Sequence, residues 1–207
     1  MTFLSSPSRS ARVTAGVVAA TTAALLLALT GCAASDNLSS QFRSGDNKNY
    51  IAGDGTVAEY AADSRGKPIV WQGVTDSGQV LSSKNLSGVV TVMNFWYAGC
   101  APCRAEAKDL ESMYQLFLPS KVQFVGVNVR DTASTALAFN RTFGMTYPSI
   151  IDNNTGSVVL AFTTAVSPQA VPTTIVIDKH GRVAARILGR LEKGTLKAMI
   201  QKVVAEK

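Results

Sequence analysis

Two cysteines separated by two residues are the side chains of this sequence best suited to chemistry. They are Cys100 and Cys103, in the run WYAGCAPC at positions 96–103. Two thiols at this spacing can form and release a disulfide, and one helical turn separates them if a helix begins between them. A cysteine at a helix N-terminus meets unpaired N–H groups and the positive end of the helix dipole, which favour the thiolate. We therefore expect Cys100 to be the nucleophile and Cys103 the resolving thiol.

Three alternative roles for this pair are less favoured. A zinc site needs further ligands, but Cys32 is distant in sequence and His180 is the only histidine, so we expect no metal. In the predicted turn around Asp178 and Gly181, His180 is interpreted as a solvated residue. A purely structural disulfide would remove little chain entropy because it closes so short a loop. The third alternative is a chance spacing.

The pair lies where a buried strand is predicted to end and a helix to begin. The run VVTVMNF at 89–95 is largely apolar and β-branched, as in a strand covered on both faces. A helix is expected over about 101–118, where apolar residues recur every three or four positions and Pro102 suits the first turn. A second buried strand is predicted at 122–129. Asp131 is expected to cap a further helix that ends near residue 143.

Two hairpins and a last helix complete the predicted order of elements. Strands are predicted at 68–71 and 79–81, again at 173–177 and 183–188, and an amphipathic helix at about 192–205. Parallel strands need helical crossovers, whereas the strands of a hairpin are antiparallel. The sequence therefore predicts an α/β fold with a mixed central sheet flanked by helices and an N-terminal β-hairpin extension.

The N-terminal residues predict export and a lipid anchor. Arg9 and Arg12 precede an unbroken run of small and apolar residues at 13–29, which indicates a signal peptide over 1–31. The sequence Leu-Thr-Gly-Cys that ends at Cys32 resembles a bacterial lipobox, so this cysteine is the expected lipidated first residue of the mature protein. The alternative is an uncleaved anchor helix followed by a chance cysteine. Both interpretations place the remainder outside the cytoplasm, where disulfides persist.

The rest of the chain is divided by composition. Residues 32–50 are rich in Ser, Asn, Asp and Gly, which indicates a flexible tether, and residues 51–207 are long enough for one domain. With 46% hydrophobic and 16% charged residues, the 207-residue chain is neither a disordered nor a coiled-coil protein. The formal charge of +6 is spread along the sequence, which argues against a nucleic-acid-binding arm.

The two cysteines and their flanks resemble the TlpA/ResA group of thioredoxin-like proteins. The resemblance rests on WYAGCAPCRAE, on VVTVMNFW before it and on AVPTTIVID about 70 residues later, and it covers about 68–207. It implies a thioredoxin-like fold and a membrane-tethered disulfide oxidoreductase outside the cytoplasm that acts as a monomer, without a cofactor. In this group the proline that matches Pro172 is cis and faces the dithiol, which leaves the backbone at Val171 free to pair with a substrate peptide. Trp96 is then expected to shield the sulfurs and to help substrate dock, or simply to pack in the core.

The sequence departs from thioredoxin at one position that matters for proton transfer. Thioredoxin keeps a buried acid where this chain has Asn94, which cannot exchange a proton. Glu106 is the nearest acid, three residues after Cys103 on the same helix face, and the TlpA/ResA group commonly carries an acid there. It could accept the Cys103 proton, or it could be a glutamate of the first helical turn stabilised by the helix dipole.

The resemblance favours a reductase, and two alternatives stay open. As a reductase the protein would act on protein disulfides, such as those of apocytochrome c haem-binding cysteines, with electrons from a membrane thiol carrier. The first alternative is oxidative folding of secreted proteins, since dithiols of this kind span about −270 to −120 mV. The second is a copper-handling module, although copper-delivery relatives generally use CxxxC with a distant histidine. A peroxiredoxin is less favoured because its Pro-x-x-x-Thr/Ser-x-x-Cys pattern is missing.

Overall fold

The computed structural model describes residues 57–163 and 171–206, all within one compact unit. The predicted signal peptide, the lipidated Cys32 and the tether lie outside the described residues. Within the described ranges, every helix is too short or too polar to cross a membrane.

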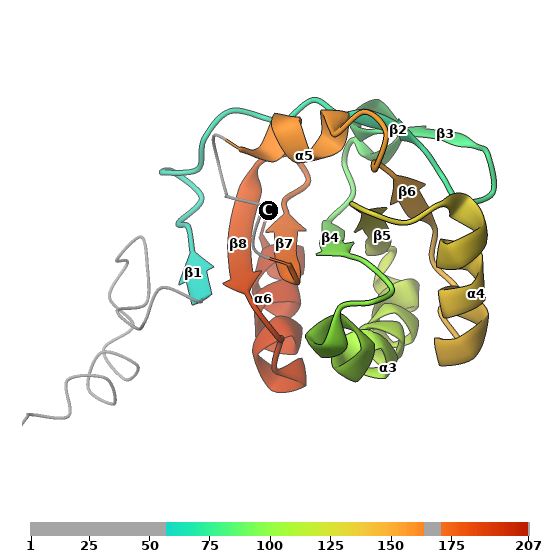
Figure 1. Ribbon diagram of the computed structural model, residues 1–207. Coiled ribbons are helices and arrows are strands. Elements are labelled where there is room, and N and C mark those ends of the chain that lie inside the picture. Colours follow the sequence, from blue (N-terminus) through green and yellow to red (C-terminus); the bar gives the residue numbers. More distant parts are fainter. Residues whose placement is uncertain (1–56, 164–170, 207) are drawn as a thin grey trace, which may run out of the picture. The chain divides into compact units, whose positions relative to one another are not determined.

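In the described part of the chain, six strands form one mixed sheet in the order β1-β8-β7-β4-β5-β6 (Figure 1). Their bounds are β1 (Val57–Glu59), β4 (Thr91–Trp96), β5 (Gln123–Asn128), β6 (Ser149–Ile151), β7 (Thr173–Ile177) and β8 (Val183–Leu188). Strands β4, β5 and β6 run parallel, whereas β7 is antiparallel to both β4 and β8. The predicted mixed sheet is confirmed, and its central strand β4 is buried along its whole length.

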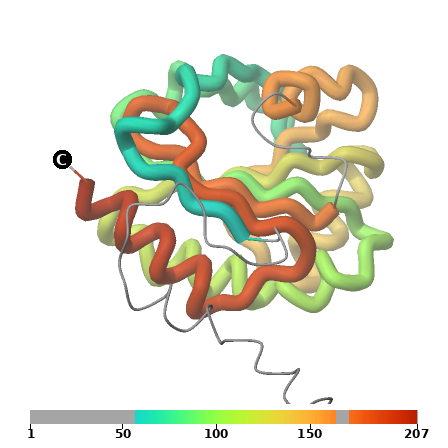
Figure 2. The backbone as a smooth tube through the Cα atoms, turned by 90° about the vertical axis from the view of Figure 1, so that its left-hand side faces the viewer, coloured from blue at the N-terminus to red at the C-terminus, as the bar shows by residue number. Residues whose placement is uncertain are grey.

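Helices and apolar clusters cover both faces of the sheet. The helices are α3 (Ala101–Phe117), α4 (Ala133–Phe143), α5 (Ser157–Phe162) and α6 (Lys193–Ala205), with short 3-10 turns η1 (Ser83–Leu86) and η2 (Leu118–Ser120). Alternate residues of a strand point to opposite faces. Accordingly, Val92 packs in a cluster with Leu110 of α3 and Met199 of α6, whereas Met93 packs with Val158 and Phe162 of α5. Figure 2 shows α6 on one side of the sheet and α5 on the other.

A short hairpin lies at the edge of the molecule near β6. Its strands β2 (Gln72–Val74) and β3 (Val80–Ser82) are antiparallel, so the predicted N-terminal hairpin is confirmed, but the range 68–71 predicted for its first strand is wrong because the strand begins only at Gln72. The bridge between Thr75 and Ile150 connects it to β6. A Cβ atom at Gly73 would collide with the Ile150 side chain, so only glycine allows this close approach.

The structure also corrects the sequence interpretation at several points. Helix α4 begins after Thr132, whose Oγ1 accepts the Thr135 N–H at 3.4 Å, so the prediction that Asp131 caps this helix is wrong. The short elements β1, β6 and α5 were not predicted. Each is three to six residues long, too short to show a hydrophobic period of its own.

Candidate active site

Cys100 and Cys103 form a disulfide at the N-terminus of α3. Cys100 is the N-cap residue, Pro102 lies in the first turn, and the Cys103 N–H donates to the Cys100 Sγ at 3.2 Å. The two Cα atoms are 5.2 Å apart, and each cysteine is only 3% exposed. The Cys100 sulfur thus receives a backbone N–H at the positive end of the helix dipole, an arrangement that stabilises a thiolate once the disulfide is reduced.

The other residues predicted for substrate contact surround this disulfide. The Val171–Pro172 peptide bond is cis, and β7, which starts at the next residue, pairs Thr173 with Phe95 at the end of β4. Val171 and Trp96 belong to the same apolar cluster as the two cysteines. Trp96 is 4% exposed and its ring lies 4.4 Å from that of Phe139, so it packs beneath the disulfide as part of the core.

Glu106 is fully buried one helical turn after Cys103. It is the sixth residue of α3, so the interpretation as a first-turn glutamate is wrong. Its Oε1 accepts from the Asn94 amide at 3.0 Å, and its Oε2 accepts the Leu191 N–H at 3.0 Å. The side chain is therefore held by two donors on different strands or loops, both of them neutral.

This environment changes the proton affinity of the carboxyl group. Burial raises the pKa of Glu106 to about 7, against the opposing effects of the Leu191 N–H, the Asn94 amide and the positive charge of Arg190. A group with a pKa near 7 can both accept and donate a proton at neutral pH. The arrangement therefore allows proton exchange next to the dithiol.

Asn94 contributes a contact that the sequence did not reveal. Its Nδ2 donates to Glu106 and also to the Thr174 Oγ1, both at 3.0 Å, from the middle of β4. Asn94 cannot exchange a proton, as expected, but it fixes the position of the residue that can. A polar residue within the buried run VVTVMNF was the available signal, because a buried amide requires partners.

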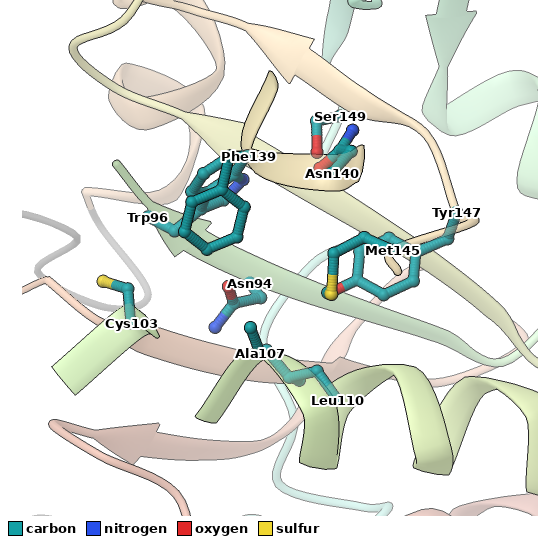
Figure 3. Close-up of a pocket in the computed structure, with 10 residues that line it drawn as sticks. All are labelled: Asn94, Trp96, Cys103, Ala107, Leu110, Phe139, Asn140, Met145, Tyr147 and Ser149. Carbon is teal, nitrogen blue, oxygen red and sulfur yellow. The ribbon is translucent and has the colours of Figure 1, made fainter. Parts of the chain in front are cut away.

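A small cavity reaches from Cys103 into the core (Figure 3). About 10 Å³ of it is open to the centre of a water molecule, which is room for a single water. Its lining comprises Asn94, Trp96, Cys103, Ala107, Leu110, Phe139, Asn140, Met145, Tyr147 and Ser149. In Figure 3 Asn94 lies between Cys103 on one side and Tyr147 on the other.

The fold and this site define a class of protein. A disulfide at the junction of a buried strand and a helix, with a cis-proline beside it on a mixed sheet, is the arrangement of thioredoxin-like thiol-disulfide oxidoreductases. Residues 61–202 match the family model described as Redoxin, and the chain belongs to this family.

Individual relatives agree with this assignment. The chain is 29% identical over 131 residues to the thiol-disulfide oxidoreductase ResA of Bacillus cereus, covering 63% of this chain and 73% of that protein. Among solved structures it resembles a DsbF homologue from Corynebacterium diphtheriae (31% identity, TM-score 0.65, 73% and 95% of the two chains). It also resembles a secreted thiol-disulfide isomerase from Corynebacterium glutamicum (27% identity, TM-score 0.67, 77% and 98%). The protein is therefore a thiol-disulfide oxidoreductase of the ResA type, as the resemblance predicted.

Proposed function

We propose that the protein reduces disulfides of other proteins outside the cytoplasm, at the membrane surface where a lipid on Cys32 holds it. The observation that carries this proposal is the dithiol at the N-terminus of α3 with the buried Glu106 one turn beyond it. The resemblance of the sequence to the TlpA/ResA group favours the reductive direction, and the secreted relative from Corynebacterium glutamicum supports a location outside the cytoplasm.

In the proposed reaction the reduced enzyme donates two electrons. The Cys100 thiolate attacks one sulfur of a substrate disulfide, forms a mixed disulfide and releases the first substrate thiolate, which takes up a proton. The Cys103 thiol then loses its proton to Glu106 and attacks the Cys100 sulfur. This step breaks the mixed disulfide, releases the second substrate thiolate and leaves Cys100 and Cys103 oxidised as in the structure. A thiol carrier in the membrane restores the dithiol.

The substrate is proposed to lie along Val171 and Pro172. Val171 is half-buried in the cluster that contains the disulfide, and the Pro172 carbonyl is already occupied by the Gly189 N–H at 2.8 Å. An extended peptide can therefore pair with the backbone at Val171 while its cysteine reaches Cys100. Trp96 supports this surface from below. The haem-binding cysteines of apocytochrome c are the proposed substrates.

Insulin reduction by the wild type, Cys100→Ser and Cys103→Ser tests the assignment of the two thiols. Cys100→Ser should lose activity at least about 100-fold because it lacks the nucleophile. Cys103→Ser should accumulate a mixed disulfide, and identifying the trapped protein names the substrate. Activity that survives in Cys100→Ser contradicts the proposal. Cys32→Ser is the matched control. Because it cannot carry the proposed lipid, this variant should no longer be found in the membrane fraction, but it should keep its activity on insulin.

The reduction potential separates the proposed direction from its alternative. A reductase should equilibrate in glutathione buffers nearer to about −270 mV than to about −120 mV, the values of strongly reducing and strongly oxidising dithiols. A potential at the oxidising end would instead support oxidative folding of secreted proteins.

A further inference from the structure

We propose that Asp131 is a positioning residue for Cys100, which it fixes through the backbone two residues earlier. The segment before Cys100 continues in the direction of β4, and the segment after β5 continues beside it. The first contact between these segments is a hydrogen bond from the Val129 N–H to the Trp96 carbonyl at 3.1 Å. The parallel pairing of the two strands thus extends past their ends toward the disulfide.

The next two residues of each segment are also in contact. The Arg130 guanidinium lies over the Tyr97 ring, 4.2 Å from its centre. The Asp131 Oδ2 accepts the Ala98 N–H at 2.6 Å, a short hydrogen bond to a charged acceptor. Three consecutive residues after β5 therefore hold three consecutive residues before Gly99 and Cys100.

Asp131 is itself held rigidly by Asn128. The Asn128 Nδ2 donates to the Asp131 Oδ2 at 2.8 Å, and the Asn128 Oδ1 accepts the Asp131 N–H at 2.7 Å. Asn128 is completely buried at the end of β5, and its carbonyl accepts the Asp152 N–H at 2.9 Å. The carboxylate that holds Ala98 is thus fixed to the sheet and does not depend on a mobile loop.

The hydrogen bond to Ala98 also fixes the backbone position of Cys100, because both residues belong to one tight turn. The Cys100 N–H donates to the Tyr97 carbonyl at 3.1 Å, which closes a tight turn around Ala98 and Gly99. On the opposite side of Ala98, its carbonyl accepts from the Arg104 guanidinium at 3.4 Å. When the disulfide is reduced, Cys100 loses its covalent link to Cys103. The turn held by Asp131 then still positions the thiolate at the helix N-terminus.

A charged side chain at this position also has an unfavourable effect. A carboxylate near the thiolate opposes its formation by Coulomb repulsion. We infer that Asp131 acts by geometry and that its negative charge is not required. The Asp131→Asn variant distinguishes these two effects, because an asparagine oxygen can still accept the Ala98 N–H while the charge is removed.

The test compares Asp131→Ala, Asp131→Asn and Asp131→Glu, with Asp63→Ala as a control at an exposed aspartate. The readouts are the pH profile of Cys100 alkylation, the rate of insulin reduction and the midpoint of thermal unfolding. Asp131→Ala should react about tenfold more slowly, because small displacements of reacting groups are costly. Its thiolate should form at higher pH, because the loss of the fixed position at the helix N-terminus outweighs the relief of the Coulomb repulsion. Asp131→Glu, with a longer side chain, should behave similarly. Asp131→Asn should remain within about twofold of the wild type, like Asp63→Ala.

Two outcomes overturn the inference. One is a wild-type rate and pH profile in Asp131→Ala. The other is an Asp131→Asn variant as slow as Asp131→Ala, which would show that the charge acts. If Asp131→Ala fails to fold, the inference is tested by the other two variants: Asp131→Asn should keep the wild-type rate and Asp131→Glu should lose it. The inference rests on the proposed role of Cys100, and the two are separable: active Cys100→Ser defeats that role, whereas inactive Cys100→Ser with fully active Asp131→Ala defeats only this inference.

Discussion

Two carboxylates are buried near opposite ends of strand β7, and their surroundings differ. Near the start of β7, Glu106 accepts hydrogen bonds from an amide and a backbone N–H, both neutral groups. Just after the end of β7, Asp178 accepts from two guanidinium groups, those of Arg65 and Arg182, at 2.9 and 2.8 Å. Both carboxylates are at most 3% exposed. Burial alone therefore does not distinguish them.

The difference appears in their proton affinities. Burial raises the pKa of Glu106 to about 7. Burial also acts to raise the pKa of Asp178, but the backbone N–H of Arg182, the Arg65 guanidinium and the other donors together hold it below the ordinary value. Two backbone N–H groups and two guanidinium groups together make Asp178 a structural anion, whereas two neutral donors contact Glu106 and leave it able to exchange a proton at neutral pH.

The largest expected effect is the loss of the structural anion. Asp178→Ala leaves Arg65, whose side chain is 2% exposed, without one of its two carboxylate partners. Arg65 keeps its pair with Glu206, but the His180 and Arg182 N–H groups also lose their acceptor. We therefore expect the free energy of unfolding to fall by about 4 kcal/mol, within the range for breaking a buried ion pair. Urea unfolding measures it.

The variant should keep its catalytic activity wherever it is folded, because Asp178 lies at the other end of β7 from the dithiol. Insulin reduction at low temperature provides this control. Lost activity with unchanged stability would contradict the division between the two carboxylates. Lys202→Ala, which removes an exposed ion pair with Glu59, should change stability by less than about 1 kcal/mol.

The second effect is a pH dependence of stability that comes from Glu106. Its pKa is about 7 in the folded protein and near 4.5 in an unfolded chain. Between these values the folded state binds more protons, so the free energy of unfolding falls as pH rises, by up to about 3 kcal/mol. Urea unfolding of the oxidised protein at pH 4.5 to 8 measures this decline.

Glu106→Gln is the matched variant, because glutamine does not titrate. The part of the decline that comes from Glu106 should be absent in it, whatever its absolute stability. If Glu106 accepts the Cys103 proton, this variant should also release mixed disulfides at least about tenfold more slowly. Parallel stability profiles in the two proteins would show that Glu106 does not exchange its proton in this range.

The smallest effect concerns the neutral donor. Asn94→Ala removes a hydrogen bond that lowers the pKa of Glu106, so this pKa should rise above 7. Stability should fall by about 1 to 2 kcal/mol for the lost buried hydrogen bonds. The pH profile of mixed-disulfide release should shift to higher pH. A shift to lower pH would mean that Asn94 does not stabilise the ionised carboxylate.

The long periodic elements and the dithiol could be predicted from the sequence. The strands β4, β5, β7 and β8 and the helices α3, α4 and α6 have hydrophobic patterns of sufficient length. Strand β1 could not be predicted, because three residues acquire their pairing only from β8. Strand β6 could not be predicted either, because its three residues acquire their pairing only from β5.

The site was only partly predictable, because the role of Asp131 depends on a distant partner. Asp131 has the local sequence of a helix cap, but its carboxylate accepts a hydrogen bond from the N–H of Ala98, 33 positions earlier in the chain. The burial of Glu106 did leave a signal. Glu106 falls on the helix face of Cys103 and Leu110, at spacings of three and four, so its position in the core could have been read from the sequence.

The order of strands in the sheet has a consequence for the folding of the protein during its synthesis. Strand β4 lies between β5, which follows it closely in sequence, and β7, whose Thr174 is 80 residues beyond Asn94. Cys100 and Cys103 directly follow β4 and precede both of these partner strands in sequence. A nascent chain therefore presents both thiols before the strand that completes their surroundings has been synthesised. During this interval the dithiol lacks the surroundings that β7 completes, so its protection from other thiols and oxidants depends on how fast the C-terminal third follows.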